Sequence, residues 1–296
     1  MAGGTLRLAA PAKLNLYLHV TGKRADGYHL LDSLVAFVDI ADGVTIVPAA
    51  ALSFTADGPF ARAFAHEDPA GNLVVRAARE LAAAVGREPN VALSLTKNLP
   101  VASGIGGGSA DAAACLKGLA RLWDIDPVGE TVMKVAAKLG SDIPACLAGR
   151  VCYMGGVGTE LAPAPRLPEA GLLLVNPGIG LSTPAVYRAR QGAFTSAMRF
   201  DAPPKDARAL AALLAERGND LTDAAIGQVP EIAAVLTAIG GAEGNLLPRM
   251  SGSGATCFGI FEDKAAASRA AAAVQAANAN WWVAAGRLVQ DTAELN

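Results

Sequence analysis

One short stretch of the chain combines residues that suit phosphate binding. Strong helix formers run from residue 109 to residue 123, and Ser109 is expected to cap the N-terminus of that helix. The loop just before it holds four glycines within five positions: Gly104, Gly106, Gly107 and Gly108. Free backbone N–H groups in such a loop, together with the positive end of a helix dipole, bind phosphate groups. The sequence therefore predicts a nucleotide-binding loop.

Two common phosphate-binding motifs do not fit this loop completely. The string Gly-x-x-x-x-Gly-Lys-Ser/Thr is absent. The dinucleotide motif Gly-x-Gly-x-x-Gly is half met, because Ser109 stands where the third glycine belongs. A strand at 91–96 precedes the loop, but Asp124, the acidic residue at about the right distance, falls at the end of a helix. A dinucleotide site and a plain glycine-rich connection stay open as alternatives.

Composition limits the partners and the compartment. The net charge of −2 over 296 residues gives no general attraction to nucleic acid or to an anionic membrane, so we expect neither as a partner. Only three histidines and no Cys-x-x-Cys argue against a zinc site. Met1 to Thr5 lack the basic start of a signal peptide, and no apolar run is long enough to span a membrane. We expect a cytoplasmic protein with four buried free thiols: Cys115, Cys146, Cys152 and Cys257.

The start of the chain predicts a strand that carries polar groups on one face. Apolar and polar residues alternate from Lys13 to Val20, as in a half-buried strand. Its polar face carries Lys13, Asn15, Tyr17 and His19. A turn is predicted at 39–43, because Asp-Ile-Ala-Asp-Gly is a turn-forming string.

The remaining elements alternate between strands and helices without a regular βαβ repeat, which favours an α+β or α/β fold. A proline-rich stretch at 163–168 places a boundary near residue 160, between domains 1–160 and 161–296. Further strands are expected at 44–47, 91–96, 172–175 and 256–261, with a hairpin at 151–161. Helices are expected at 72–85 (capped by Asn72 and ended by Gly86), 109–123, 127–139 (opened by Pro127), from 183 onward, and at 205–217, 230–239 and 263–277.

Several ordered segments resemble the superfamily of small-metabolite kinases that includes galactokinase, homoserine kinase, mevalonate kinase and phosphomevalonate kinase. The loop at 100–110 is similar to its Pro-x-x-x-Gly-Leu-Gly-Ser-Ser-Ala-Ala signature, with Ile105 for leucine and one extra glycine. The segments at 11–34, 140–144 and 251–258 resemble one branch, the 4-diphosphocytidyl-2-C-methyl-D-erythritol kinases. Ala102, Ser103 and Ala110 depart from the usual pattern.

The resemblance implies an α+β, two-domain small-metabolite kinase fold. Its N-terminal domain would be ribosomal-protein-S5-like α/β, its C-terminal domain ferredoxin-like α+β, and its active site would lie in the cleft between them. The implied reaction is ATP-dependent phosphorylation of the 2-hydroxyl of 4-diphosphocytidyl-2-C-methyl-D-erythritol in non-mevalonate isoprenoid biosynthesis. ATP would be the phosphoryl donor, and the small-molecule substrate would carry a cytidine diphosphate group. Mg²⁺ is implied without its protein ligands, and the chain would be a monomer or a homodimer.

The resemblance also implies roles for particular residues. Asp142 would be the catalytic base and Lys13 would orient it and stabilise the transferred charge, although the local sequence also fits a helix-capping Asp142. Asn219 and Asp220 would be structural. The substrate would contact Asn15, Tyr28, His29 and Tyr187. ATP would contact Pro100, Val101, Ala102, Ser103, Gly104, Ile105, Gly106, Gly107, Gly108, Ser109 and Ala110.

Three alternatives follow from the same residues. A related kinase could phosphorylate homoserine, mevalonate or a sugar, which would leave the Tyr28–His29 pair without a cytosine to bind. A dinucleotide-binding oxidoreductase would use the glycine loop alone. A nucleotide-binding regulator without catalysis would not need the Lys13–Asp142 pair.

Overall fold

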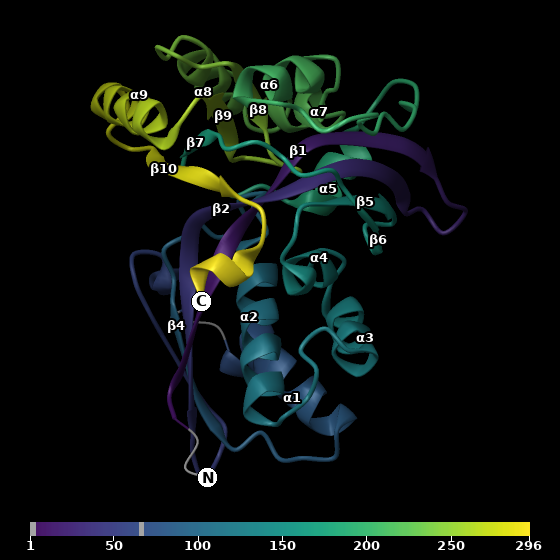
Figure 1. Ribbon diagram of the computed structural model, residues 1–296, viewed down its shortest axis with the longest axis vertical. Coiled ribbons are helices and arrows are strands. Elements are labelled where there is room, and N and C mark those ends of the chain that lie inside the picture. Colours follow the sequence, from purple (N-terminus) through teal and green to yellow (C-terminus); the bar gives the residue numbers. More distant parts are fainter. Residues whose placement is uncertain (1–3, 65–67) are drawn as a thin grey trace.

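The computed structural model describes residues 4–64 and 68–296 (Figure 1). The expectation of no leader peptide concerned Met1 to Thr5, and residues 1–3 of that segment lie outside the described residues. Within the described part of the chain, no helix is long and apolar enough to cross a membrane.

Two long antiparallel strands run through the whole molecule: β1 (Leu6–Lys23) and β2 (His29–Pro48). In Figure 1 they pass from the lower half of the molecule to the upper half. The prediction of a half-buried β1 was wrong, because every residue from Ala10 to Val20 is buried, the polar ones included. The prediction of one polar face was also wrong, because the register shifts between Asn15 and Tyr17 and divides the four polar residues between two faces. Their side chains pair with protein groups: Lys13 with Asp142, Asn15 with Ser33, Tyr17 with Asp32, and His19 with the Ser196 carbonyl.

The predicted turn at 39–43 was also wrong, since β2 continues through it. Its two aspartates are used as ion-pair partners instead of turn formers. Asp39 accepts from Lys264 and from the backbone N–H of Arg287. Asp42 accepts from Lys97. Such partners stabilise an extended backbone at residues that otherwise favour turns.

The lower half adds two strands to β2 and packs helices against them. β4 (Val91–Thr96) lies antiparallel to β2, and β3 (Ser53–Asp57) lies parallel to β4. α2 (Gly107–Leu122) packs on β1 and β2, with α1 (Leu73–Ala84), α3 (Glu130–Leu139) and α4 (Ile143–Ala148) beside it. Short 3₁₀ turns lie at Ala61–Phe64 and Pro69–Gly71.

The N-termini of the helices confirm one of the predicted start residues and contradict two. Asn72 caps α1 by accepting a hydrogen bond from the backbone N–H of Val74, as predicted. The prediction of Ser109 as N-cap was wrong, because Gly106 takes that position and α2 begins at Gly107. Likewise α3 begins after Gly129 and not at Pro127.

The upper half is a second antiparallel region covered by helices. β7 (Gly171–Asn176) lies between β10 (Trp282–Val289) and β9 (Cys257–Phe261), and β8 (Leu247–Met250) pairs with β9. β5 (Cys152–Gly156) and β6 (Glu160–Pro163) form the predicted hairpin, and β5 joins β2. The helices here are α5 (Thr183–Ala189), α6 (Ala207–Ala215), α7 (Thr222–Ile226), α8 (Glu231–Gly240) and α9 (Lys264–Ala277). The final 3₁₀ turn, Thr292–Leu295, returns to the lower half, where it contacts β1 and α2.

β10 connects the two regions by pairing with β2 at Val38 and Phe37. The described strands therefore form one continuous ten-stranded network, in which β3–β4 is the parallel pair. A dinucleotide-binding fold needs parallel βαβ units around its glycine loop, and this sheet does not supply them. The mixed arrangement of helices and mainly antiparallel strands confirms the predicted α+β class.

Candidate active site

A cleft of about 1270 Å³ lies between the glycine loop, the start of α4, the loop after β1 and the start of α5. All four segments were predicted to carry site residues. Nine of the eleven predicted loop residues line it, from Pro100 to Ser109. The exceptions are Ile105, which is fully buried in the core, and Ala110, a buried residue of α2. Lys13, Asn15, Asp142, Tyr28, His29 and Tyr187 also line the cleft.

Lys13 and Asp142 meet in this cleft although 129 positions separate them in the sequence. The Lys13 Nζ lies 2.9 Å from Asp142 Oδ2, with the lysine side chain buried and the carboxylate about one-third exposed. Asp142 stands at the N-cap position of α4, but its side chain makes no capping hydrogen bond. The carboxylate is therefore turned to the ammonium group and to the cleft, and the capping alternative was wrong.

The backbone of β1 fixes Lys13 against the glycine loop. The Lys13 N–H donates to the carbonyl of Ile105 at 2.9 Å, and its Nζ donates to Asn15 Oδ1 at 2.9 Å. The Asn15 Nδ2 in turn donates to Ser33 Oγ at 2.8 Å. Asn15 thus positions the ammonium from the same face of β1, as the alternation along that strand predicted.

A second glycine segment, 251–254, supports the loop from the C-terminal half. Ser251 Oγ accepts from the Asn15 N–H and donates to the Gly104 carbonyl. A Cβ on Gly104 would lie 2.5 Å from the Gly254 carbonyl oxygen, and the φ of Gly104 is +77°. Glycine is required there because the two backbones touch. The sequence marked this segment as a motif without a role, and its contact with the loop depends on the tertiary fold.

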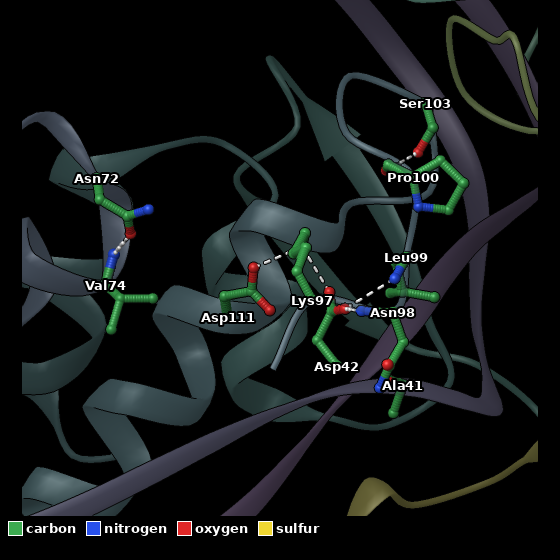
Figure 2. Close-up of polar contacts among 10 residues, drawn as sticks. All are labelled: Ala41, Asp42, Asn72, Val74, Lys97, Asn98, Leu99, Pro100, Ser103 and Asp111. Atoms are coloured by element: carbon green, nitrogen blue, oxygen red, sulfur yellow. Dashed lines mark hydrogen bonds and ion pairs between the residues drawn. The ribbon is translucent and has the colours of Figure 1, made fainter. Parts of the chain in front are cut away.

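A buried ion cluster under the loop was not predicted. Figure 2 shows Lys97 between Asp42 and Asp111, with Nζ–Oδ2 distances of 2.5 Å and 2.6 Å. All three residues are at most 2% exposed, yet Lys97 and Asp111 line the cleft. The available signal was a lysine placed directly between the apolar alternation of 91–96 and the glycine loop.

The aromatic residues gather at the other end of the cleft. His29 stacks on Tyr187, with ring centroids 5.2 Å apart and an interplanar angle of 27°. Tyr28 is 65% exposed in the loop after β1. Burial and the nearby positive charges of Lys23 and Arg190 lower the pKa of His29, so its ring is neutral at pH 7. Burial and the Asp142 carboxylate raise the pKa of Tyr187, which stays protonated.

This arrangement can activate a hydroxyl group beside bound phosphates. It joins a carboxylate, an ammonium group and the N-terminus of the 16-residue helix α2 in one cleft. Metal binding has less support. In the part of the chain that the structure describes, no three His, Cys, Asp or Glu side chains are grouped to hold a metal ion.

Comparisons with known proteins show what this chain is similar to. The family model of the GHMP kinases N terminal domain matches residues 72–150, and that of the GHMP kinases C terminal matches residues 196–280. A 4-diphosphocytidyl-2-C-methyl-D-erythritol kinase from Paramagnetospirillum magneticum is 54% identical over 95% of this chain and 98% of its own length. The one from Rhodospirillum rubrum is 49% identical over 97% of this chain and 94% of its own.

Solved structures show the same fold. A crystal structure of a 4-(cytidine 5'-diphospho)-2C-methyl-D-erythritol kinase superposes with a TM-score of 0.78 at 33% identity, covering 96% of this chain and 99% of that chain. The homoserine kinase from Cytophaga hutchinsonii reaches 0.72 at 16% identity, over 99% and 96% of the two chains. At that identity the second match concerns the fold alone.

Proposed function

Because this chain belongs to the 4-diphosphocytidyl-2-C-methyl-D-erythritol kinases of the GHMP kinase superfamily and is an ATP-dependent kinase, we propose how its own residues carry out the reaction. The acceptor is the 2-hydroxyl of 4-diphosphocytidyl-2-C-methyl-D-erythritol, and the products are its 2-phosphate and ADP, in isoprenoid precursor biosynthesis. The observation that carries the proposal is the Lys13–Asp142 contact of 2.9 Å beside the glycine loop.

Asp142 accepts the proton of the substrate hydroxyl while the oxygen of that hydroxyl forms a bond to the γ-phosphorus of ATP. The bond between that phosphorus and the oxygen bridging to the β-phosphate breaks, and ADP leaves with the bond's electron pair. Lys13 holds the carboxylate in place and stabilises negative charge on the transferring group. Asn15, which accepts from the Lys13 ammonium, restricts the position of that charge.

The glycine loop and α2 hold the phosphates. The backbone N–H groups in the first turn of a helix have no acceptor within the helix, and here that turn opens at Gly107 against the cleft. The left-handed conformation of Gly104 and Gly106 brings the loop backbone close to this turn. The phosphates can therefore approach the main chain without meeting a Cβ.

The cytidine end of the substrate is assigned to the aromatic end of the cleft. His29 and Tyr187 already stack on each other, so the base would lie on one outer face of this pair and not between the rings. A neutral His29 can exchange hydrogen bonds with a pyrimidine edge. Tyr28 is exposed enough to close over the base, and Lys23 lines the same region and suits the diphosphate.

Phosphoryl transfer also implies Mg²⁺, for which the described residues provide no group of three suitable side chains. The carboxylates that line the cleft beside the loop, Asp142 and Asp111, are already paired with lysines. The residues present do not fit a metal held by the protein. We propose that the ion arrives on the phosphate oxygens of ATP with its own water ligands. We also propose a cytoplasmic location, where ATP is supplied.

Replacing the proposed base tests the mechanism. We expect Asp142→Asn to lower kcat by at least about 100-fold while ADP affinity stays within about twofold, because the amide cannot take the proton. Lys13→Met should lower kcat more than it raises the KM of either substrate. The measurement is steady-state ADP release, with Asp201→Asn, an exposed loop carboxylate, as the matched control. Unchanged turnover in Asp142→Asn would remove this residue from the mechanism.

A substrate panel tests the acceptor. We expect ADP release with 4-diphosphocytidyl-2-C-methyl-D-erythritol and at least about 100-fold lower kcat/KM with mevalonate, homoserine or galactose, since these lack the group that His29 and Tyr187 would recognise. His29→Ala should raise the KM for the cytidylyl substrate and leave the KM for ATP unchanged. Equal activity on an acceptor without cytidine would contradict the assignment of the aromatic end.

A further inference from the structure

The Lys97–Asp42–Asp111 cluster joins the two ends of the phosphate loop. Lys97 follows β4 just before the loop, and Asp111 lies in the second turn of α2 just after it. Asp42 Oδ1 accepts the backbone N–H groups of Asn98 and Leu99, at 2.5 Å and 2.8 Å, where the chain enters the loop (Figure 2). The cluster therefore closes the base of the loop with charged hydrogen bonds.

The ammonium group of Lys97 lies next to Gly107, the first residue of α2. A Cβ on Gly107 would stand 3.1 Å from Lys97 Nζ and 3.6 Å from Asp42 Oδ2. The charge of this cluster therefore acts on the same few N–H groups that would bind phosphate. With one ammonium and two carboxylates, the fully ionised cluster carries one net negative charge close to the anion site.

The two carboxylates differ in their surroundings. Asp42 receives hydrogen bonds from Lys97 and from two backbone N–H groups. Asp111 receives one, from Lys97, and its Oδ1 is buried without a partner among the described residues. An unpartnered buried carboxylate oxygen disfavours the charged form. Of the two, Asp111 is the one that takes up a proton.

On this basis, and resting on the ATP site proposed above, we propose that Asp111 is a positioning residue of the phosphate loop that acts through Lys97, and that nucleotide binding is coupled to proton uptake by this cluster. The proton cancels the net negative charge under the loop, so a bound anion favours the protonated cluster and the protonated cluster favours the anion. The same carboxyl, protonated or not, keeps Lys97 between β2 and α2.

The pKa direction agrees with this geometry. Burial raises the pKa of Asp111 to about 8, with Asp42 adding to the increase and Lys97 opposing it. The two carboxylates in turn raise the pKa of Lys97, against its burial, so the ammonium keeps its charge. The proton of Asp111 is therefore exchanged at a higher pH than that of an ordinary carboxyl group.

Other charged groups near α2 face elsewhere. Lys13 of β1 pairs with Asp142 on the far side of Gly106. Lys117, further along α2, donates to Cys146 and Thr292, and burial lowers its pKa. The remaining charged groups of α1, α2 and α3 are exposed or paired at the surface: Arg76, Arg79, Glu80, Arg121, Glu130, Lys134 and Lys138. On β1 and β2, Arg7 is exposed, Asp32 pairs with Arg199, Asp39 pairs with Lys264, the His19 ring contacts the Ser196 carbonyl, and Lys23 and His29 line the cleft.

Calorimetric titration of the full chain with ADP, in two buffers of different ionisation enthalpy, tests the coupling. If binding raises the pKa of Asp111 by one unit, wild type takes up about half a proton per ADP at pH 8.5 and close to none at pH 6.5. Its affinity then falls by up to about tenfold between pH 7 and pH 9.5. The phosphates of ADP are fully ionised above pH 8, so they do not contribute there.

Asp111→Asn keeps an oxygen acceptor for Lys97 and removes the titration. We expect this variant to bind ADP like wild type at pH 7, to bind more tightly than wild type at pH 9.5, and to take up no proton at pH 8.5. A role in stability alone would weaken binding at both pH values. Asp201→Asn, the same change in an exposed loop, should behave as wild type throughout.

The outcomes separate the two proposals. ADP binding to wild type without proton uptake at pH 8.5 overturns the coupling and leaves the kinase site in place. Equal proton uptake in wild type and Asp111→Asn overturns the assignment to Asp111. Absence of ADP binding to wild type at pH 7 overturns the proposed site and the coupling with it. Because the first outcome uses wild type alone, it holds even if the variant does not fold.

Discussion

The side chain of Lys13 passes directly behind the backbone of Gly106. A Cβ on this glycine would lie 3.1 Å from Lys13 Cε and 3.2 Å from Lys13 Cβ, and its φ of +65° lies in the left-handed region. Two constraints therefore act on one residue: the backbone conformation and the space that the ammonium side chain needs. The space needed by the Lys13 side chain links the loop to catalysis, because Lys13 contacts Asp142.

Gly106→Ala should therefore damage turnover more than stability. The left-handed conformation costs an alanine about 1 kcal/mol, and the new methyl group would push the Lys13 stem away from Asp142. We expect kcat to fall by at least about tenfold, measured by ADP release at saturating substrates, with the melting temperature followed in parallel.

Gly86→Ala provides the matched control. Gly86 has the same φ of +65°, but a Cβ there would meet no atom within 4 Å. We expect the same loss of about 1 kcal/mol in stability and full activity. If both variants lost turnover equally, contact with Lys13 would not be the cause.

The sequence allowed Lys13, Asn15 and Asp142 to be predicted as a site, since they lie in motifs whose residue types suit phosphoryl transfer. The motif also named two loop residues, Ile105 and Ala110, whose side chains pack in the core instead. A run of consecutive loop residues cannot all face a ligand, because neighbouring side chains point in different directions. Which ones do so is decided by the loop conformation.

At the scale of the elements, hydrophobic periodicity located most helices and strands. α1, β4, β7 and α9 lie within two residues of their expected bounds. The errors came where a residue type or short string is compatible with two local structures. Ser109 and Pro127 are common at helix starts, yet a glycine precedes each of the helices α2 and α3. The Asp39–Gly43 string is typical of a turn, yet long-range ion pairs keep it within β2.

β1 shows what periodicity alone could not predict. Its alternation correctly placed Lys13 and Asn15 on one face, but the register shifts between Asn15 and Tyr17, so Tyr17 and His19 lie on the other face. Leu18 instead lines the cleft with Lys13 and Asn15, and both faces are buried. Two covering groups come from far along the chain: Ser251, which accepts from the Asn15 N–H, and the Ser196 carbonyl at His19. A third, Asp32, lies on the paired strand β2 and accepts from Tyr17. Because this cover is tertiary, single-strand patterning could not distinguish it from solvent.

At the scale of the whole molecule, side-chain hydrogen bonds between distant segments hold the C-terminal half against β1. Asn219 Nδ2 donates to the carbonyls of Met250 and Gly252, both at 2.8 Å, and its Oδ1 accepts from the Leu221 N–H. Asp220 Oδ2 accepts from the Val20 N–H. These contacts agree with the structural role expected for the pair, whereas the domain boundary near residue 160 stays a prediction.

Asn219→Ala should loosen the glycine segment 251–254 and, through it, the phosphate loop. Carbonyls left without a donor cost about 1–3 kcal/mol, which corresponds to a fall in melting temperature of several degrees, and we expect the KM for ATP to rise. The measurements are thermal unfolding and steady-state kinetics. Asn278→Ala, which loses one hydrogen bond to the Val274 carbonyl at the end of α9, should keep a normal KM for ATP. A wild-type KM in Asn219→Ala would rule out this support.

β1 and β2, with 18 and 20 residues, belong to both halves of the molecule, and the Lys13 backbone lies in the middle of their paired region. A scissor-like opening of the halves would have to bend this shared ladder at the catalytic lysine itself. We therefore expect substrate entry and product exit to depend on the short segments 24–28 and 101–103, which contribute residues to the lining of the cleft. We expect the two halves of the enzyme to keep their relative position during turnover while these short segments move.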